Sequence, residues 1–514
     1  MSAQPAVNRD AFAQARESFG AIETFLGSKE ACSLRESDLE RELEKRGREL
    51  MRQLLEAHIE VRGPGEAAAP VEGTDGEERV QQRLHDRGLE TVFGEVRIER
   101  AGYVAKGMDS LHPMDADLNL PQELYSHEVR RRVGWAAAGS SFDEVIGMLS
   151  ETTGAHVGKR QVEELVIRAA EDFDAFYKEG YGFRPWEQSG PIMVVTVDGK
   201  GVVMRHEDLR EATQKKVETT RHKLTSRLSR GEKRNSKRMA TVAAVYTIQP
   251  YSRTAEDVVG CLAPQHKREG PGRPRPENKR VWASLEKTPE EIIKEAFREA
   301  RMRDPEGHKR WVALVDGNET QLEILRKRFH NEGYYPWIIL DFIHVAERVW
   351  KAGLDFHREG TSELETWVSK RLLAILNGRT AHVAAGMRRS ATLHGLDEPA
   401  RQRIDSCADY LLKYKKNMQY DQYLKMGLPI ATGVIEGACR YLVKDRMDRT
   451  GARWSLKGAE AVLRLRALRT SGDFDAYWPF HEEQEYLRNH VALYAGGKVT
   501  PIRSRAKKHL RRVK

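Results

Sequence analysis

Three apolar segments of strand length, each followed at once by an aspartate, constrain the fold of this chain most. Asp198 follows Ile-Met-Val-Val-Thr-Val, Asp316 follows Trp-Val-Ala-Leu-Val, and Asp341 follows Trp-Ile-Ile-Leu. Such runs are typical of buried strands. After Asp198 the sequence Gly-Lys-Gly favours a turn into a hairpin whose second strand is 201–205. The pattern predicts a sheet that presents carboxylates at the ends of its strands.

A fourth acid, Glu436, lies near the start of a later helical pattern, Thr-Gly-Val-Ile-Glu-Gly-Ala-Cys-Arg. A further strand is predicted over 241–248, and helices over 289–301, 321–329 and throughout 345–425. The order of these elements is that of the RNase H-like fold, in which two strand-borne carboxylates meet a third acid from a late helix. The predicted fold class is therefore α/β, with an RNase H-like catalytic core and an all-helical insertion.

Clustered carboxylates repel one another unless cations lie between them. Mg²⁺ prefers oxygen ligands and keeps several waters, so few protein carboxylates suffice. Two such ions about 3.5–4 Å apart support phosphoryl transfer. We predict that Asp198, Asp316 and Glu436 are the catalytic residues and the ligands of two Mg²⁺ ions, for which Mn²⁺ could substitute. The alternative for one Asp-Gly pair is a turn, but two such pairs on apolar strands argue against it.

The residues after Glu436 carry cations at helical spacing. Arg440 and Lys444 stand four and eight residues on, so the acid and both cations would share one helix face. We predict that both cations contact phosphates, the alternative being an exposed salt bridge with Glu436. Arg453 is a further predicted DNA contact, and Trp454 is predicted to stack on an unpaired base or, alternatively, to lie in the core.

The positive charge of the chain is unevenly distributed. There are 86 Lys and Arg against 77 Asp and Glu, a net charge of +9 with a pI near 9.2. Between 215 and 238, ten Lys and Arg less two Glu leave +8, which indicates contact with a phosphate backbone. The residues assigned to this contact are Arg227, Lys233, Arg234, Lys237 and Arg238. A basic loop is expected over 265–280, and a basic tail over 503–514.

The N-terminal third reads as helical and DNA-binding. Helices are expected over 10–26 and from the capping box Ser37-x-x-Glu40, with dimerisation through its leucines as an alternative to packing on the body. Residues 63–76 have the composition of a linker, and a small β element is expected near 95–100.

A helix-turn-helix is predicted between 141 and 166. The capping box Ser141-x-x-Glu144 opens the first helix, and Thr-Gly-Ala-His-Val precedes the second. The second helix begins with Lys159, Arg160 and Gln161, which we predict to contact base edges or phosphates. The alternative is a solvated helix start.

The cysteine spacing and the apolar segments indicate in which cellular compartment the protein is expected. The four cysteines are far apart and form no CxxC pair, which fits a reducing environment rather than a disulfide framework or a zinc ribbon. The first residues contain no apolar signal-peptide core, and no uninterrupted 18-residue apolar run occurs. We therefore expect a cytoplasmic, nucleoid-associated protein without a membrane partner.

These patterns divide the chain into seven expected segments. They are an N-terminal helical segment (1–62), a linker with a small β element (63–110), a helix-turn-helix DNA-binding domain (111–185), the first part of the core (190–345), a helical insertion (346–427), the last part of the core with the Glu436 helix (428–480) and a basic C-terminal tail (481–514).

From about residue 91 to 478 the chain resembles the DDE-type transposases of bacterial insertion sequences, in particular the ISKra-type group, which is distantly related to Mutator-like transposases. The resemblance rests on the motifs around Asp198, Asp316 and Glu436, and on Asp-Phe-Ile-His at Asp341–His344. It implies that the three acids are metal ligands and that Asp341-x-x-His344 lies near the active site. Asp341 is alternatively the second metal ligand, and His344 either a phosphate contact or a structural residue. Related groups carry a zinc ribbon whose cysteines this chain lacks, which puts the DNA role of the β element in question.

The resemblance implies a transposase that binds terminal inverted repeats, cleaves the element ends and joins the freed 3′-OH groups to target DNA. Its partners would be double-stranded DNA and further copies of the chain, in a homodimer or a higher synaptic assembly. The alternatives are an RNase H-like structure-specific nuclease or resolvase, and a catalytically inactive domesticated DNA-binding protein. Tyrosine or serine recombinase chemistry is a third alternative.

Overall fold

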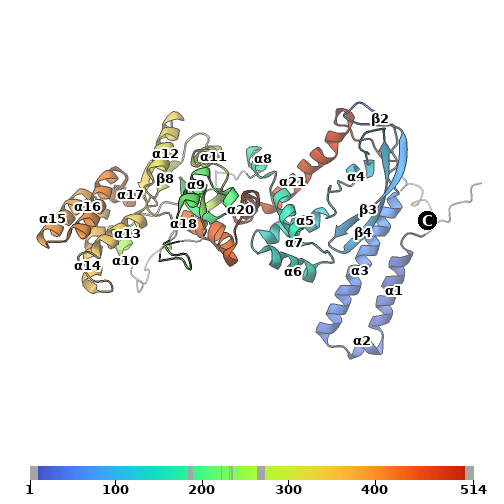
Figure 1. The fold of residues 1–514 in the computed structure, drawn as a ribbon, viewed down its shortest axis with the longest axis horizontal. Coiled ribbons are helices and arrows are strands. Elements are labelled where there is room, and N and C mark those ends of the chain that lie inside the picture. Colours follow the sequence, from blue (N-terminus) through green and yellow to red (C-terminus); the bar gives the residue numbers. More distant parts are fainter. Residues whose placement is uncertain are drawn as a thin grey trace, which may run out of the picture. The chain divides into compact units, whose positions relative to one another are not determined.

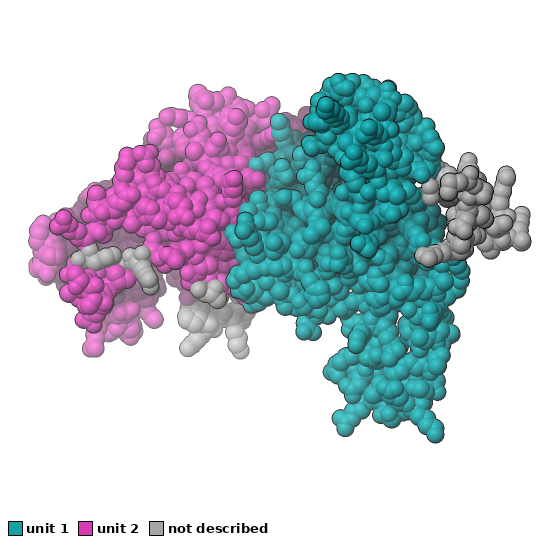
Figure 2. Space-filling model, turned by 45° about the vertical axis from the view of Figure 1, so that its right-hand side comes forward, with its two compact units in different colours: residues 1–181, 474–514 teal, residues 182–473 magenta. Residues whose placement is uncertain are grey.

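The computed structural model describes residues 10–182, 189–221, 223–230, 232, 235–262 and 272–503. The chain forms two compact units, residues 1–181 with 474–514 and residues 182–473 (Figure 2). It leaves the first unit, builds the second and returns to the first. Among the described helices, none is long and apolar enough to cross a bilayer.

The second unit is built on a five-stranded mixed sheet with the strand order β7-β6-β5-β8-β9. Strands β5, β6 and β7 pair antiparallel, whereas β8 pairs in parallel with both β5 and β9. The bounds are β5 (Ile192–Val203), β6 (Lys237–Ile248), β7 (Glu277–Ser284), β8 (Arg310–Val315) and β9 (Trp337–Leu340). The predicted mixed α/β class is confirmed.

The hairpin expected after Asp198 is wrong. Strand β5 continues through Gly199 and Gly201 as one strand of 12 residues, paired with β6 throughout. A Cβ at Gly199 would lie 3.1 Å from Met239 Cε, and one at Gly201 would lie 2.9 Å from Lys237 Cδ. The two glycines therefore allow a close approach of β6 side chains instead of making a turn.

Strand β7 occupies the end of the segment expected to be a basic loop. Residues 263–271 of that segment lie outside the described residues, but from Glu277 onward the chain pairs with β6. The first three residues of β7 are polar and half-buried, and the five that follow are buried. This polar start is why the sequence reads as a loop.

The longer helices of the second unit outside the 345–425 segment lie between strands or near the end of the unit. These are α11 (Pro289–Arg303), α12 (Glu319–Asn331) and α20 (Leu456–Ser471), with the shorter α9 (Glu211–Thr219) and α10 (Ala255–Gly260) elsewhere in the unit. Helix α11 begins at a capping box of Thr288 and Glu291 with proline at its first turn. It packs on β5 and β6, and α20 packs on β7.

The helical character expected over 345–425 is confirmed. The segment forms a group of helices (Figure 1), namely α13 (Phe342–Gly353), α14 (Ser362–Leu376), α15 (Thr380–Leu393), α16 (Glu398–Lys413) and α17 (Tyr420–Lys425). The chain then continues through three consecutive helical segments, namely the α-helix α18 (Gly433–Ala438), a π-helix (Cys439–Lys444) and the α-helix α19 (Asp445–Met447).

The first unit begins with α1 (Ala13–Leu26), α2 (Lys29–Ser33) and α3 (Glu36–Arg62). The capping box expected at Ser37 is wrong, because α3 begins at Glu36 with Arg35 as its N-cap residue. The β element is confirmed and is a long hairpin of β3 (Gln81–Thr91) and β4 (Gly94–Val104), with α3 packed on β4 (Figure 1).

Residues 63–76 do not form a free linker, as their composition suggested. They contain β1 (Val71–Glu72), which pairs with β2 (Glu78–Arg79), and the Ala68 N–H donates to the Pro501 carbonyl (2.8 Å). Ala67 and Val71 are buried in a cluster with Tyr494. Small apolar side chains within a Gly- and Pro-rich segment thus anchor it to the C-terminal part of the chain.

The remaining helices of the first unit include the two expected for a helix-turn-helix. They are α4 (Pro113–Asp117), α5 (His127–Ala137), α6 (Phe142–Thr152), α7 (Lys159–Ala169), α8 (Phe173–Lys178) and α21 (Phe474–Asn489). The Ser141/Glu144 capping box of α6 is confirmed. Helix α21 crosses the boundary expected at 480/481 and joins this unit, where the buried Arg130 pairs with Glu485. Residues 504–514 of the expected basic tail lie outside the described residues.

Candidate active site

Three aspartates lie in a row across the parallel strands β5, β8 and β9: Asp316 and Asp341 directly follow β8 and β9, and Asp198 lies within β5 at the level where β8 ends. The β5–β8 ladder is in register up to two residues before Asp198 and Asp316, so the same register places these two side by side. The β8–β9 ladder ends one residue before Asp316 and Asp341, and the Asp341 N–H donates to the Val315 carbonyl (2.7 Å). Neighbouring strands are about 4.8 Å apart, so the row spans about 10 Å.

Asp198 is half-buried and its two carboxylate oxygens have different partners. Oδ1 accepts the Gly199 N–H (2.6 Å), and Oδ2 lies 3.3 Å from Cys439 Sγ, whose thiol donates to it. Burial, and then the Asp198 carboxylate, raises the pKa of Cys439 far above its ordinary value. Cys439 is therefore a neutral donor that joins the π-helix to β5.

Asp316 stands in a turn that the helical insertion holds in place. Its Oδ1 accepts the Asn318 N–H (2.8 Å), and Gly317 has a φ of +92°, which favours glycine. The hydroxyls of Tyr410 in α16 and of Tyr414 just after it donate to the carbonyls of Asp316 (3.4 Å) and Gly317 (2.8 Å), respectively. The insertion thus fixes the backbone beside one acid of the row.

Asp341 is the most buried acid of the row, with 0% of its surface exposed. Its Oδ1 accepts the Ile343 N–H (2.6 Å) and so caps α13. Its Oδ2 accepts the Thr432 N–H (3.1 Å) and the Thr432 hydroxyl. Asp341 therefore connects the end of β9, the start of α13 and the segment leading to α18.

His344 lies one turn into α13 and faces the acids. Its Nδ1 is 3.5 Å from Asp341 Oδ2, an electrostatic contact without a well-formed hydrogen bond. The Asp341 carboxylate raises the pKa of His344 to about 9 against the effect of burial, with smaller contributions from Asp316 and Glu436. The imidazole is therefore cationic at neutral pH and offsets part of the negative charge.

Glu436 is exposed on α18 and completes the cluster. Ligand atoms of Asp341, His344 and Glu436 all lie within 4.8 Å of one another. Desolvation, followed by the carboxylates of Asp341 and Asp198, raises the pKa of Glu436. The four carboxylates therefore influence the pKa of Glu436 or of His344: Asp198 and Asp341 raise that of Glu436, and Asp316, Asp341 and Glu436 raise that of His344.

The predicted metal ligands were Asp198, Asp316 and Glu436, with Asp341 as an alternative. The β5–β8 ladder ends two residues before Asp198 and Asp316, and Glu436 lies next to Asp341 and His344. Among the described residues, the group whose ligand atoms lie within 4.8 Å of one another contains Glu436 and Asp341 but neither Asp198 nor Asp316. Sequence analysis did not find the contacts of Thr432 with Asp341 or of Cys439 with Asp198. The only sequence signal for Cys439 is its position three residues after Glu436, which places it one turn along the same helical segment.

The predicted DNA contacts at the start of α7 are exposed. Lys159 forms an ion pair with Asp143 (2.7 Å), and Arg160 forms one with Glu164 (3.1 Å). Gln161 is exposed in the same turn. Because these surface ion pairs are weak, the side chains are available to a polyanion.

The predicted contacts in the 215–238 cluster differ among themselves. Arg227 is exposed, and Lys237 is exposed with Asp448 at 3.9 Å. Arg238 instead donates to the carbonyls of Leu285 (2.9 Å) and Asp208 (3.1 Å), and burial lowers its pKa. At least part of the Arg238 guanidinium therefore has a structural role, because two of its nitrogens donate to backbone carbonyls. Lys233 and Arg234 lie outside the described residues.

The predicted contacts after Glu436 are exposed except for the tryptophan. Arg440, Lys444 and Arg453 are exposed, but the π-helix between the first two widens the turn, so the even α-helical spacing expected for them is wrong. The stacking role expected for Trp454 is also wrong, because the side chain is 7% exposed and its Nε1 donates to the Met447 carbonyl (3.0 Å). Trp454 belongs to the core.

No protein-family model matches the chain, and no curated protein matches it either. The geometry of the acid row and its surroundings is therefore the basis for a functional proposal.

Proposed function

We propose that this protein is a DNA transposase of the DDE type, with an RNase H-like catalytic core, encoded by an insertion sequence of the ISKra type. The observation that carries the proposal is the row of Asp198, Asp316 and Asp341, in which two acids directly follow β8 and β9 and the third lies within β5, with Glu436 next to Asp341. Ligand sites in sheets with parallel strands form at the carboxyl ends of those strands.

The topology supports the RNase H-like assignment. Numbered by their order along the chain, the five strands lie in the order third, second, first, fourth, fifth. The first three form an antiparallel meander, and the last two run parallel to the first. A helical insertion and a glutamate-bearing helix follow, as the sequence pattern requires.

The donor set supports Mg²⁺ as the cofactor. Asp198, Asp316 and Glu436 would hold two ions, with Asp341 as the alternative ligand. Carboxylate oxygens are the ligands that Mg²⁺ prefers, and a ring nitrogen of His344 lies within 4.8 Å of the Asp341 and Glu436 oxygens as a further possible ligand. When bound, the ions supply charge stabilisation at the attacking and leaving oxygens of the phosphoryl group.

The protein's own residues would position the DNA. The exposed Lys159, Arg160 and Gln161 would bind the terminal repeats, and Arg440 and Lys444 would hold phosphates near the acids. In the first step a water oxygen attacks the phosphorus and the bond to the 3′ oxygen breaks; one proton of the water goes to the departing 3′ oxygen and the other to solvent. In the second step that 3′-OH gives up its proton and attacks a target phosphorus, and the displaced target 3′ oxygen takes up a proton. Neither step needs a covalent bond between protein and DNA.

Because both element ends must be held at once, the functional form would be a homodimer or a higher assembly on double-stranded DNA. A nuclease or resolvase with the same acids would cleave without joining. An inactive DNA-binding descendant would do neither.

The test uses the purified full-length chain and duplex DNA that carries the element ends. We expect Mg²⁺-dependent 3′-OH ends and joined products, both lost in EDTA and in Asp198→Asn. Asp409→Asn is the matched control, because Asp409 is 69% exposed and pairs with Arg388 on the insertion. Cleavage without joining would favour the nuclease, and equal activity of Asp198→Asn and the control would refute the site.

A further inference from the structure

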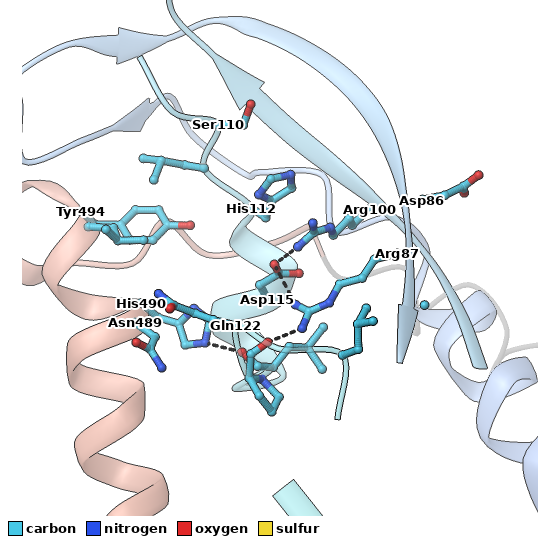
Figure 3. Close-up of a pocket in the computed structure, with 16 residues that line it drawn as sticks. Asp86, Arg87, Arg100, Ser110, His112, Asp115, Gln122, Asn489, His490 and Tyr494 are labelled. Atoms are coloured by element: carbon cyan, nitrogen blue, oxygen red, sulfur yellow. Dashed lines mark hydrogen bonds and ion pairs between the residues drawn. The ribbon is translucent and has the colours of Figure 1, made fainter. Parts of the chain in front are cut away.

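The arginines of this chain differ in whether a carboxylate already pairs with them. In the first unit, Arg87 and Arg100 line a pocket of about 500 Å³ (Figure 3), but both form ion pairs with Asp115, and Arg87 also donates to the carbonyls of Pro121 and Glu123. Because these guanidinium groups are occupied within the protein, they offer little positive charge to a ligand. A differently placed arginine lies in the second unit, beside the acid row.

This residue is Arg348, an exposed arginine of α13, the helix that Asp341 caps. Within the part of the chain that the structure describes, Arg348 forms no ion pair with a carboxylate. Its guanidinium lies over the Tyr410 ring of α16, with Cζ 3.9 Å from the ring centroid. Stacking on an aromatic face restricts the long side chain and leaves most of its N–H donors available at the edge of the planar group.

The tyrosine beneath Arg348 also contacts the acid row. Its hydroxyl donates to the Asp316 carbonyl (3.4 Å), so the Tyr410 side chain connects the arginine with this acid. Burial raises the pKa of Tyr410 to about 12; the Arg348 cation opposes this shift and the Asp316 carboxylate adds to it. Both charges therefore lie close to the same hydroxyl, and Arg348 is a cation in the immediate surroundings of Asp316.

Other cations lie near Arg348. His344 stands four residues earlier on α13 and so shares its helix face; it lies 3.5 Å from Asp341 and is cationic at neutral pH. On α12, Arg326 is also exposed. Burial raises the pKa of Tyr414, and the nearby Arg348 and Arg326 oppose this shift. Positive charge from two helices therefore borders the acids on the side of the helical insertion.

We propose that Arg348 binds a phosphate of the DNA strand that lies against the acid row, next to Asp316; this rests on the proposed function, since it takes DNA as the substrate. A guanidinium donates two parallel N–H bonds to phosphate oxygens, and an arginine that is already restricted by stacking loses less conformational freedom on binding. The acids repel a polyanion. A cation at this edge offsets part of that repulsion and fixes the position of the strand relative to Asp316.

The test measures the affinity of the full-length chain for a duplex that carries one element end, in EDTA, so that no cleavage takes place. Each phosphate around the element end is replaced in turn by an uncharged methylphosphonate. Arg348→Gln should weaken binding of the unmodified duplex about threefold to tenfold, and Arg348→Lys, which keeps the charge but not the planar fork, should weaken it less. At the contacted phosphate, the methylphosphonate should weaken binding to the unmodified chain by a similar factor and cause no further loss in Arg348→Gln.

Arg358→Gln is the matched control, because Arg358 is exposed in the segment between α13 and α14. The control should bind like the unmodified chain, and Arg348→Gln should keep the Tm, since its side chain lies on the surface. Equal affinities of Arg348→Gln and the control, or additive losses at every phosphate, would overturn the assignment of Arg348. Coupling between Arg348 and one phosphate without joined products in Mg²⁺ would support that assignment and refute only the transposase reaction, so the two failures are distinguishable.

Discussion

Replacing Asp341 with asparagine tests whether this acid stabilises the fold through the hydrogen bonds that its carboxylate accepts. The side chain is fully buried and accepts hydrogen bonds from the Ile343 N–H, the Thr432 N–H and the Thr432 hydroxyl. Asparagine keeps one oxygen and therefore the cap of α13. It places an NH₂ group where the second oxygen meets two donors, so the buried Thr432 N–H loses its acceptor.

The expected cost follows from these contacts. A buried N–H without an acceptor costs about 1–3 kcal/mol. Loss of the His344 contact adds less than about 1 kcal/mol, because that side chain is 36% exposed. We expect Asp341→Asn to lower the free energy of unfolding by about 2–3 kcal/mol. Asp316→Asn should cost less than about 0.5 kcal/mol, because its Oδ1 accepts only from Asn318 and an amide oxygen can do the same.

Denaturant unfolding of both full-length variants tests this difference, and DNA cleavage is measured below the first unfolding transition. Asp341→Asn should show a lower midpoint at unchanged slope. Asp316→Asn should unfold like the unmodified chain and yet lose cleavage. Equal midpoints for the two variants would show that Asp341 does not hold the row together as its hydrogen bonds imply.

Three further predictions concern other parts of the chain. Trp454→Ala should cost about 3–5 kcal/mol of stability while folded Trp454→Phe keeps its affinity for single-stranded DNA, and a loss of that affinity would restore a stacking role. Hydrogen bonds and ion pairs lower the pKa values of Asp172 and Glu485 below the ordinary values of 3.8 and 4.5, although burial opposes this shift. The contribution of the two carboxylates to stability is therefore complete above pH 3.8 and 4.5, respectively, and is lost as the pH falls below these values. Thermal unfolding from about pH 6 to pH 3 should show this loss, less steeply in Glu485→Gln, and parallel curves would contradict it. Arg160→Gln should reduce the slope of log affinity against log salt by about 1 for duplex DNA without changing the Tm, and an unchanged slope would exclude Arg160 from the DNA contact.

The acid row could be predicted from sequence because each of its acids directly follows a short apolar run that forms a strand. The runs before Asp198, Asp316 and Asp341 have few alternatives to a strand, and parallel strands bring their carboxyl ends to one edge. The helices also follow from their periodicity and caps, as at Thr288 and Ser141.

The failures have physical reasons as well. Gly199 and Gly201 have the composition of a turn, but the crowding that they relieve comes from β6 side chains, which the local sequence does not reveal. The polar start of β7 is stabilised by pairing with β6 rather than by its own hydrophobicity. The Asp341–Thr432 contact joins residues 91 positions apart, and only the folded insertion determines that they meet.

The return of α21 to the first unit reverses the order in which the chain can mature during synthesis. Residues 182–473 are complete when they leave the ribosome and can fold as a unit. Arg130, although made much earlier, is buried against Glu485, which emerges only near the end of translation. Helix α5 therefore lacks this partner until the second unit has left the ribosome, and a truncated product that ends before α21 would carry the whole second unit attached to an unfinished first one.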